Sequence, residues 1–415
     1  MEKESPLTIK NRHTLLPWVT VIGCMLIFIG FVASRAAASI GMITLLVAPF
    51  VLGSPKGVFK NYLRRKELYI LSLYFIIVLV SGLYSADKND WLNWVRIKLP
   101  YVALPIAFAG IQKLDTKKFT LVLYGFMLTF FVSTTAILIN YFAHYAAINE
   151  ELYKGGALPI PFSHIRYTLM LAFAFFCAIY LYGKKLYVLN ANEKWLHLLF
   201  AAFAFVALHI LAVRSGLLAL YLGLLYVALF FVFRQRKYLV GVAAVALVIV
   251  LPFAAYHFVP SFHNKISYME YDIHQIRDGK YNNLSDGIRI LSTQIGIDIW
   301  KQSPVIGIGA GDLRTEVNKV YIEQYPNITE PNRKVPHNQF VWVLASTGIV
   351  GLALFLAAFF VPLFTKKLYK HWPVMVLHLI IFSSFLTEDT LEEQMGTGFY
   401  LIFLLLLMNH FNADE

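Results

Sequence analysis

The chain has 415 residues, of which 58% are hydrophobic and only 14% are charged. Soluble domains average about 45–50% apolar and about 25% charged residues, so this composition excludes an ordinary soluble enzyme. The net charge is +12, but no basic run is interleaved with stacking aromatic residues, and nucleic acid is therefore excluded as a partner.

Apolar blocks of about 18–25 residues follow one another along the chain, the length that a helix needs to cross about 30 Å of hydrocarbon. We therefore predict an all-α polytopic membrane protein with about twelve transmembrane helices. The fourth predicted span is short and has a proline at its second position, so we expect it to be tilted or only partly inserted. The predicted spans are 15–34, 36–53, 68–85, 99–112, 120–145, 166–183, 197–213, 216–233, 238–259, 338–363, 372–388 and 397–412.

The short loops on one side of these spans hold about 20 Lys and Arg residues, whereas those on the other side hold about 7. Because positive residues are retained in the cytoplasm, both termini are predicted to be cytoplasmic. The chain then divides into nine transmembrane helices in 1–259, an external loop with amphipathic helices in 260–337, and three transmembrane helices in 338–415.

The external loop, Pro260 to Pro336, is polar and long, and function concentrates in such loops. Within it, Gly287 to Trp300 has apolar residues at helical spacing and is predicted to be an amphipathic helix packed on the membrane domain. A glycine-rich stretch, Gly307 to Asp312, is interpreted as a turn rather than a phosphate-binding loop, because its spacing and context are not those of a nucleotide site. A second short helix is predicted near Leu313 to Gln324.

Most predicted spans lack an ionisable residue at the centre, which disfavours ion-coupled transport. The polar groups gather instead at the predicted outer ends of the spans and in the external loop, where they mark one outward-facing site. They are His164, Arg166, Arg214, Ser215, Arg289, His337, Asn338, Glu388 and Asp389.

Arg214 lies close to hydrocarbon at the outer end of a span, where a guanidinium is costly unless it finds an anion. One interpretation is a snorkelling side chain or a structural salt bridge to Glu388 or Asp389. The functional alternative is a fork that binds phosphate oxygens bidentately. Arg289, in the amphipathic loop helix, is either part of a solvated face or a second such fork, and two forks would suit a diphosphate.

His337 and Asn338 open the tenth predicted span, and Gly348 and Gly351 follow. At 3.6 residues per turn, Gly348 is expected beneath His337 on the same helix face, where small residues let a neighbouring helix approach closely. His337 is either an interfacial histidine that caps the helix or a general base, since only histidine has an unperturbed pKa near neutrality.

This pattern of His-Asn, nine intervening residues and Gly-x-x-Gly resembles the signature of the O-antigen ligase and O-antigen polymerase superfamily. The resemblance extends to an arginine in the long external loop and to the Arg-Ser-Gly at Arg214 to Gly216. It covers the motifs from about residue 212 to the C-terminus, and the rest of the chain only in architecture.

The resemblance implies an inverting, metal-independent glycosyltransferase of the GT-C type with an undecaprenyl-diphosphate-linked glycan as donor. By position, Arg214 and Arg289 would bind the diphosphate and His337 would activate the acceptor. Family ligases often have leucine four residues after the loop arginine, whereas Thr293 follows Arg289 here. Arg314 or Arg333 therefore stays open as the second ligand.

No cofactor and no metal site are expected, because the sequence has no Asp-x-Asp motif, and Glu270-x-Asp272 and the acids of 388–393 are weak candidates. His164 and Arg166 are either interfacial anchors or the lining of a substrate cleft. Ser215, Asn338 and Glu388 are candidates for supporting roles in the site.

Together these features predict a multi-pass transferase of the bacterial inner membrane whose active site faces the periplasm. It would move a glycan from undecaprenyl diphosphate to the lipid A core oligosaccharide, in contact with membrane lipids. Within the same chemistry, the alternatives are a repeat-unit polymerase, with a glycan acceptor, and a protein O-oligosaccharyltransferase. A polysaccharide exporter is the alternative from another class, and it predicts that His337 is not needed for bond formation.

Overall fold

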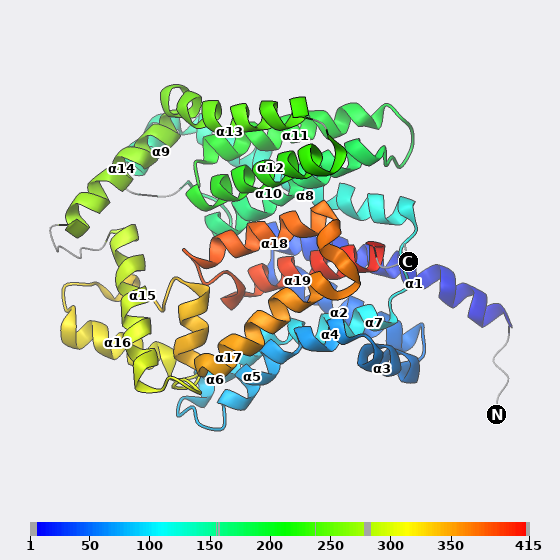
Figure 1. Cartoon of the computed structure of the whole chain (residues 1–415), viewed down its shortest axis with the longest axis horizontal. Coiled ribbons are helices and arrows are strands. Elements are labelled where there is room, and N and C mark those ends of the chain that lie inside the picture. Colours follow the sequence, from blue (N-terminus) through cyan, green and yellow to red (C-terminus); the bar gives the residue numbers. More distant parts are fainter. Residues whose placement is uncertain (1–5, 155, 157, 237, 278–283, 412–415) are drawn as a thin grey trace.

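The structure is a computed structural model that describes residues 6–154, 156, 158–236, 238–277 and 284–411. Within these ranges every regular element is a helix, as predicted (Figure 1). The first nine are α1 (Pro6–Val32), α2 (Arg35–Val51), α3 (Pro55–Arg64), α4 (Lys66–Leu71), α5 (Leu73–Ser81), α6 (Lys88–Lys98), α7 (Pro100–Gly110), α8 (Thr116–Ala143) and α9 (Tyr145–Tyr153).

The second half of the chain continues with longer helices and three short 3-10 turns. These elements are α10 (His164–Lys184), α11 (Glu193–Leu211), α12 (Arg214–Gln235), α13 (Tyr238–Phe258), α14 (Pro260–Arg277), α15 (Ser285–Gln302), α16 (Leu313–Gln324), η1 (Glu330–Asn332), α17 (Gln339–Phe364), η2 (Thr365–Lys370), α18 (Trp372–Phe385), η3 (Thr390–Glu392) and α19 (Gln394–Phe411).

The helical membrane fold is confirmed, but the count of twelve spans is not. Among the described residues seven helices are long and apolar enough to cross a membrane, or eight if α2 and α3, which meet at 109°, form one broken span. The predicted spans 68–85, 99–112 and 372–388 do form helices, but these are short: α4 ends just before Ser72, α7 has 11 residues and α18 has 14.

Local sequence signals explain where several helices begin. The side chain of Asp87 accepts hydrogen bonds from the backbone N–H groups of Asn89 and Asp90 at the start of α6, and Asp115 caps α8 in the same way. Such caps satisfy N–H groups that have no partner inside the helix. Proline begins α7 at Pro100, a position where its missing N–H costs nothing.

Helices α10 and α19 form the centre of the bundle, and most of their residues are buried. Helix α10 packs against α11, α12 and α18, while α1 packs against α2 and α8. The beginning of α1 and the end of α19 lie at one end of the molecule, and α14, α15 and α16 lie at the other (Figure 1).

The long loop between α13 and α17 is largely helical. Helix α15 confirms the predicted amphipathic helix, since it buries Ile288, Leu291, Ile295 and Ile299 and packs on α17. Helix α16 has the predicted bounds. Helix α14 was not predicted, although Phe262, Ile266, Met269, Ile273 and Ile276 recur in it at helical spacing.

Gly348 breaks α17 rather than forming a smooth helix face. Its φ of 66° and ψ of −167° are outside the helical region, and a side chain there would meet the carbonyl oxygen of Val305 at 2.2 Å from Cβ. Only glycine adopts such a conformation at low cost. The interpretation that Gly348 lies beneath His337 on one helix is therefore wrong, because His337 precedes α17 and Gly348 interrupts it.

The segment from Pro304 to Asp312 fills this break. The N–H of Ile349 donates to the carbonyl of Pro304 at 2.9 Å, and the carbonyl of Ala345 accepts from Ile308 at 3.0 Å. The backbone N–H groups of the glycine-rich stretch bond within the protein, which supports its interpretation as a turn. Its Asp312 also accepts from the backbone ahead of α6.

Candidate active site

His337 is fixed immediately before α17 by its neighbours on both sides. Its backbone N–H donates to the hydroxyl of Ser292 on α15 at 3.3 Å. The next residue, Asn338, caps α17 by accepting from the N–H groups of Phe340 and Val341, and it donates to the carbonyl of Leu386. The predicted supporting residue Asn338 therefore joins the start of α17 to the segment after α18.

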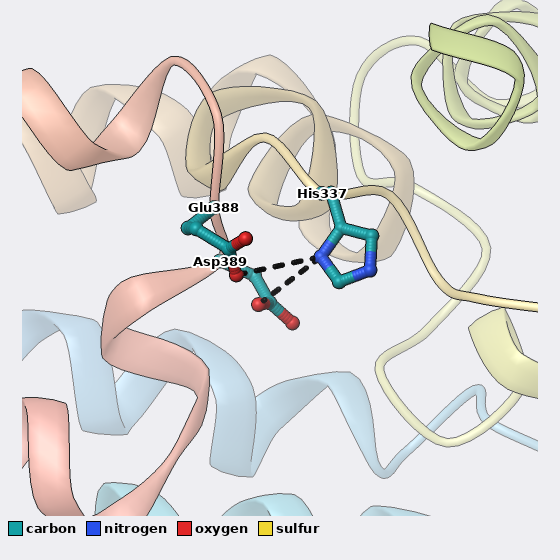
Figure 2. Close-up of side chains that lie close together, drawn as sticks. All are labelled: His337, Glu388 and Asp389. Carbon is teal, nitrogen blue, oxygen red and sulfur yellow. Dashed lines mark ion pairs between the residues drawn. The ribbon is translucent and has the colours of Figure 1, made fainter. Parts of the chain in front are cut away.

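The ring of His337 faces two carboxylates from that segment. Its Nδ1 lies 3.6 Å from Oε2 of Glu388 and 3.9 Å from Oδ1 of Asp389. Figure 2 shows that both contacts involve Nδ1, while the second ring nitrogen points away from the carboxylates. The ring is 21% exposed, whereas Glu388 is 5% exposed, so the histidine has one buried edge and one accessible edge.

The two carboxylates have opposite pKa shifts. Burial acts to raise the pKa of Glu388, but its contact with His337 and the charge of Arg289 lower that pKa to about 2. Burial raises the pKa of Asp389 to about 6, against the lowering effect of Arg166 and His337. Glu388 is therefore ionised throughout the physiological range, whereas Asp389 gains a proton in mildly acidic conditions.

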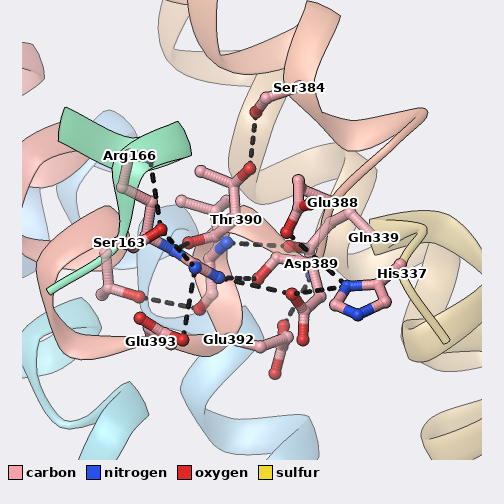
Figure 3. A network of polar contacts seen from close by, with 12 residues as sticks. Ser163, Arg166, His337, Gln339, Ser384, Glu388, Asp389, Thr390, Glu392 and Glu393 are labelled. Carbon is pink, nitrogen blue, oxygen red and sulfur yellow. Dashed lines mark hydrogen bonds and ion pairs between the residues drawn. The ribbon is translucent and has the colours of Figure 1, made fainter. Parts of the chain in front are cut away.

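Arg166 of α10 contacts the carboxylate segment, residues 388–393, which follows α18. Its guanidinium donates to the backbone carbonyls of Asp389 and Thr390, and it pairs with the carboxylates of Asp389 at 3.3 Å and Glu393 at 3.2 Å (Figure 3). The side chain is 5% exposed, so Arg166 is a buried residue that links α10 to the segment after α18 rather than an interfacial anchor. His164 lies half-buried two residues earlier, at the start of α10.

Arg214, at the start of α12, makes a bidentate pair with Asp286 of α15. Its Nη1 donates to Oδ2 at 2.7 Å and its Nη2 to Oδ1 at 2.6 Å. The predicted need for an anion is confirmed, but Glu388 and Asp389 are not that anion. Ser215 follows Arg214 in the first turn of α12.

Arg289 connects this pair with the histidine. It donates to Oδ1 of Asp286 and to Oε1 of Glu388, both at 3.1 Å. Its side chain is 24% exposed, so the interpretation of a freely solvated face is wrong. A chain of contacts thus runs from Arg214 through Asp286, Arg289 and Glu388 to His337.

The other candidate arginines lie elsewhere. Arg314 stands 3.6 Å from Asp90 and over the ring of Trp94, and Arg333 donates to the carbonyl of Ile328. Of the three loop arginines proposed as the second ligand, the structure brings only Arg289 to Arg214.

Lys265 of α14 is a cation of this cluster that the sequence did not single out. Burial and the charges of Arg214 and Arg289 lower its pKa to about 8, and its Nζ donates to the carbonyl of Gly156. Beside Lys265 and Arg214 lies a cavity of about 150 Å³ whose other walls are mainly apolar, including Leu217 and Phe262. Cations and an apolar cavity therefore adjoin here.

A fully buried network lies below the carboxylate segment. Oε1 of Glu392 pairs with Nζ of Lys98 at 2.7 Å and accepts from the Tyr74 hydroxyl at 2.5 Å and from the amide of Gln339 at 2.6 Å. Gln339 in turn accepts from the N–H of Leu391. This network joins α5, α6 and α17 to the segment that carries Glu388 and Asp389.

His337, Glu388 and Asp389 are the described residues that could hold a metal ion, because one ligand atom from each lies within 4.8 Å of the others. Both carboxylates, however, already pair with arginines, Arg289 and Arg166. Each guanidinium supplies the positive charge that a cation would bring. The donor set therefore fits a histidine–carboxylate–arginine site better than a metal centre.

The comparison with protein families agrees with the resemblance found in the motifs. The O-antigen ligase family matches residues 198–356, so this part of the chain is a domain of that family. The match includes Arg214, Arg289 and His337, whereas the segment with Glu388 and Asp389 follows it. No curated protein matches the chain.

Proposed function

We propose that the protein is an inverting glycosyltransferase that moves a glycan from undecaprenyl diphosphate to a hydroxyl of the lipid A core oligosaccharide. The reaction takes place at the periplasmic face of the bacterial inner membrane, with both termini in the cytoplasm. The O-antigen ligase domain over residues 198–356 supports this class of enzyme. The mechanism rests on His337, whose Nδ1 faces two carboxylates while the other edge of its ring is accessible.

His337 is proposed as the general base. Its outward ring nitrogen takes the proton of the acceptor hydroxyl while the acceptor oxygen attacks the anomeric carbon of the donor sugar. Because Glu388 and Asp389 face the opposite nitrogen, their negative charge stabilises the imidazolium that forms. A carboxylate behind a catalytic histidine has the same effect in hydrolytic triads.

Arg214 and Arg289 are proposed to bind the donor diphosphate. The bond between the anomeric carbon and the diphosphate oxygen breaks as the new bond forms on the opposite face, and the leaving lipid diphosphate keeps the electron pair. Charge therefore grows on the diphosphate in the transition state, and two guanidinium groups stabilise it there more than in the ground state. No step requires a metal ion.

Asp286 holds both guanidiniums in the free enzyme and leaves part of each for the donor. Arg214 is 40% exposed and the side chain of Arg289 is 24% exposed. The apolar cavity beside Arg214 and Lys265 suits the first isoprene units of a lipid whose headgroup lies at the cations.

The identity of the acceptor distinguishes this proposal from two alternatives that share its chemistry. A repeat-unit polymerase and a protein O-oligosaccharyltransferase would use the same donor site and the same base, with a lipid-linked glycan or a Ser or Thr hydroxyl as acceptor. A polysaccharide exporter would use the helices but not His337. The match of residues 198–356 to the O-antigen ligase family favours an enzyme over the exporter.

The test is the glycan profile of a deletion strain complemented with wild type, His337→Gln or His144→Gln. His144 is an exposed histidine that follows α8, so its variant controls for the loss of a histidine as such. We expect His337→Gln to lack glycan on lipid A and to accumulate long lipid-linked chains, while the control matches wild type.

The other outcomes decide between the alternatives. Lipid A that carries a single repeat would indicate a polymerase, and loss of glycoproteins alone would indicate a protein acceptor. Full complementation by His337→Gln would refute the assignment of the base and favour the exporter.

A further inference from the structure

A cavity of about 610 Å³ lies at the end of the bundle opposite His337. It is enclosed by the last turns of α10, α12 and α19 and by the first turn of α18. Helix α10 begins beside the site at His164 and reaches the cavity at Lys184, which at 1.5 Å per residue is about 30 Å. The cavity and the candidate active site are therefore about 30 Å apart along α10, close to the thickness of the hydrocarbon core of a membrane.

Three cations from three different elements line this cavity: Lys184 ends α10, Arg234 is in the last turn of α12, and Lys370 precedes α18. No acidic residue lines it. Among the described residues, none of the three cations has a carboxylate partner. All three are exposed, so the rim carries positive charge that the protein does not neutralise.

The walls below these cations are aromatic and already packed. Tyr180 meets Trp372 edge to face at 5.7 Å between ring centroids, and His371 stacks on Phe411 at 4.1 Å. Between them, a methyl group added at Gly183 would have no atom within 4 Å. The cavity therefore has open space beside packed aromatic walls.

Cations at the rim of the cavity and apolar residues in its walls indicate which kind of ligand would bind there. A phosphate group matches the rim, because basic residues at the ends of transmembrane helices attract anionic headgroups. Leu229 and Phe233, on the outer surface of α12, are exposed apolar residues that could contact acyl chains. A soluble anion would use the cations but not the aromatic wall.

We propose that the cavity bounded by Lys184, Arg234, Lys370 and Trp372 binds the headgroup phosphate of an acidic phospholipid from the leaflet opposite the candidate active site. The three cations hold the phosphate, and the aromatic wall packs against the glycerol and the first methylene groups. This site is independent of the proposed transferase reaction.

The test uses the tryptophan of the cavity wall as a reporter. The full-length protein is reconstituted in vesicles that contain brominated phosphatidylglycerol or brominated phosphatidylcholine, whose bromine atoms quench tryptophan fluorescence on contact. We expect the phosphatidylglycerol to quench at a mole fraction about ten times lower. Trp372→Phe should remove this extra quenching, which assigns it to the cavity.

Two triple variants distinguish the cavity from general surface charge. Lys184→Gln with Arg234→Gln and Lys370→Gln should abolish the preference for phosphatidylglycerol. The matched control neutralises three exposed cations of α3, Lys56, Lys60 and Arg64, which do not line the cavity, and should keep the preference.

Each remaining outcome would overturn the proposal. Equal quenching of the wild type by both lipids would show an apolar groove without headgroup selectivity. Equal losses in the two triple variants would show that net charge alone attracts the lipid. Displacement of phosphatidylglycerol by inorganic phosphate would show a site for a soluble anion.

Discussion

Arg214 and Arg289 donate to the same carboxylate oxygen, Oδ1 of Asp286, at 2.6 and 3.1 Å. Two guanidiniums in one place repel each other, and the shared oxygen removes that repulsion while it fixes their separation. The pKa of Asp286 is held below its usual range, because the charges of Arg214 and Arg289 outweigh the effect of burial. Asp286 therefore organises the proposed diphosphate site.

Asp286→Asn tests this organising role. The amide keeps the shape of the side chain but removes the charge, so we expect the KM for the lipid diphosphate donor to rise about tenfold, with little change in the KM for the acceptor. The measurement is steady-state transfer with a synthetic donor. The matched control is Asp298→Asn, an exposed carboxylate of the same helix that pairs with Lys301. A fall in the donor KM would show instead that Asp286 competes with the diphosphate.

Substitution of the loop arginines separates the three candidates for the second diphosphate ligand. Arg289→Lys keeps the charge but loses the fork that joins Asp286 and Glu388, and we expect transfer to fall at least tenfold. Arg314→Lys and Arg333→Lys, whose side chains lie outside the cluster, should retain most of the activity. Loss of transfer in either control, with Arg289→Lys active, would reverse the assignment.

The transfer rate should depend on the protonation of Asp389. Its raised pKa, about 6, means that it is ionised at pH 7.5 and protonated below pH 6, where it no longer stabilises a positive charge on His337. The rate should therefore fall as the pH decreases through 6. Asp389→Asn should lower the rate at pH 7.5 and remove this fall near pH 6 from the pH–rate profile. Coincident profiles for variant and wild type would exclude this role for Asp389.

Much of the fold follows from information that is local in the sequence. Apolar blocks and their periodicity predict helices such as α10, α15 and α17, because burial in lipid or against a neighbour depends mainly on side-chain hydrophobicity. The count of spans does not follow in the same way. The break after α4 at Ser72 interrupts an apolar segment whose sequence gives no clear boundary.

The residues of the site were predictable, but their pairing was not. Arg214, Arg289 and His337 stood out because charged groups at the ends of apolar spans need partners. The partner of Arg214, Asp286, lies on a helix far along the chain, and no sequence spacing relates the two. Asp286 does precede Arg289 by three residues in an amphipathic helix, a signal that could have identified it. The helical spacing of Phe262, Ile266 and Met269 could have predicted α14, but nothing in the sequence relates Lys265 to Arg214.

Gly348→Ala should destabilise the protein through the backbone. The positive φ is costly for alanine, and its Cβ would lie 2.2 Å from the carbonyl oxygen of Val305, so we expect a loss of more than about 2 kcal/mol in the free energy of unfolding. Thermal unfolding in detergent measures it. Gly183→Ala, a helical position with open space around Cβ, is the control and should be neutral or slightly stabilising. Equal melting temperatures for the two variants would show that the break in α17 is not required.

The contributions of Lys98 and Glu392 to the free energy of unfolding should depend on each other, because the two residues form a buried ion pair. Both side chains have no exposed surface, and Nζ of Lys98 lies 2.7 Å from Oε1 of Glu392. Lys98→Met leaves a carboxylate without a counter-charge, and we expect it to cost about 3–5 kcal/mol of unfolding free energy. Adding Glu392→Gln removes the uncompensated charge, so the double variant should recover a large part of that loss, measured by thermal unfolding in detergent. Simple additivity of the two single losses would mean that hydrogen bonds to Tyr74 and Gln339, rather than the charge of Lys98, stabilise the buried carboxylate.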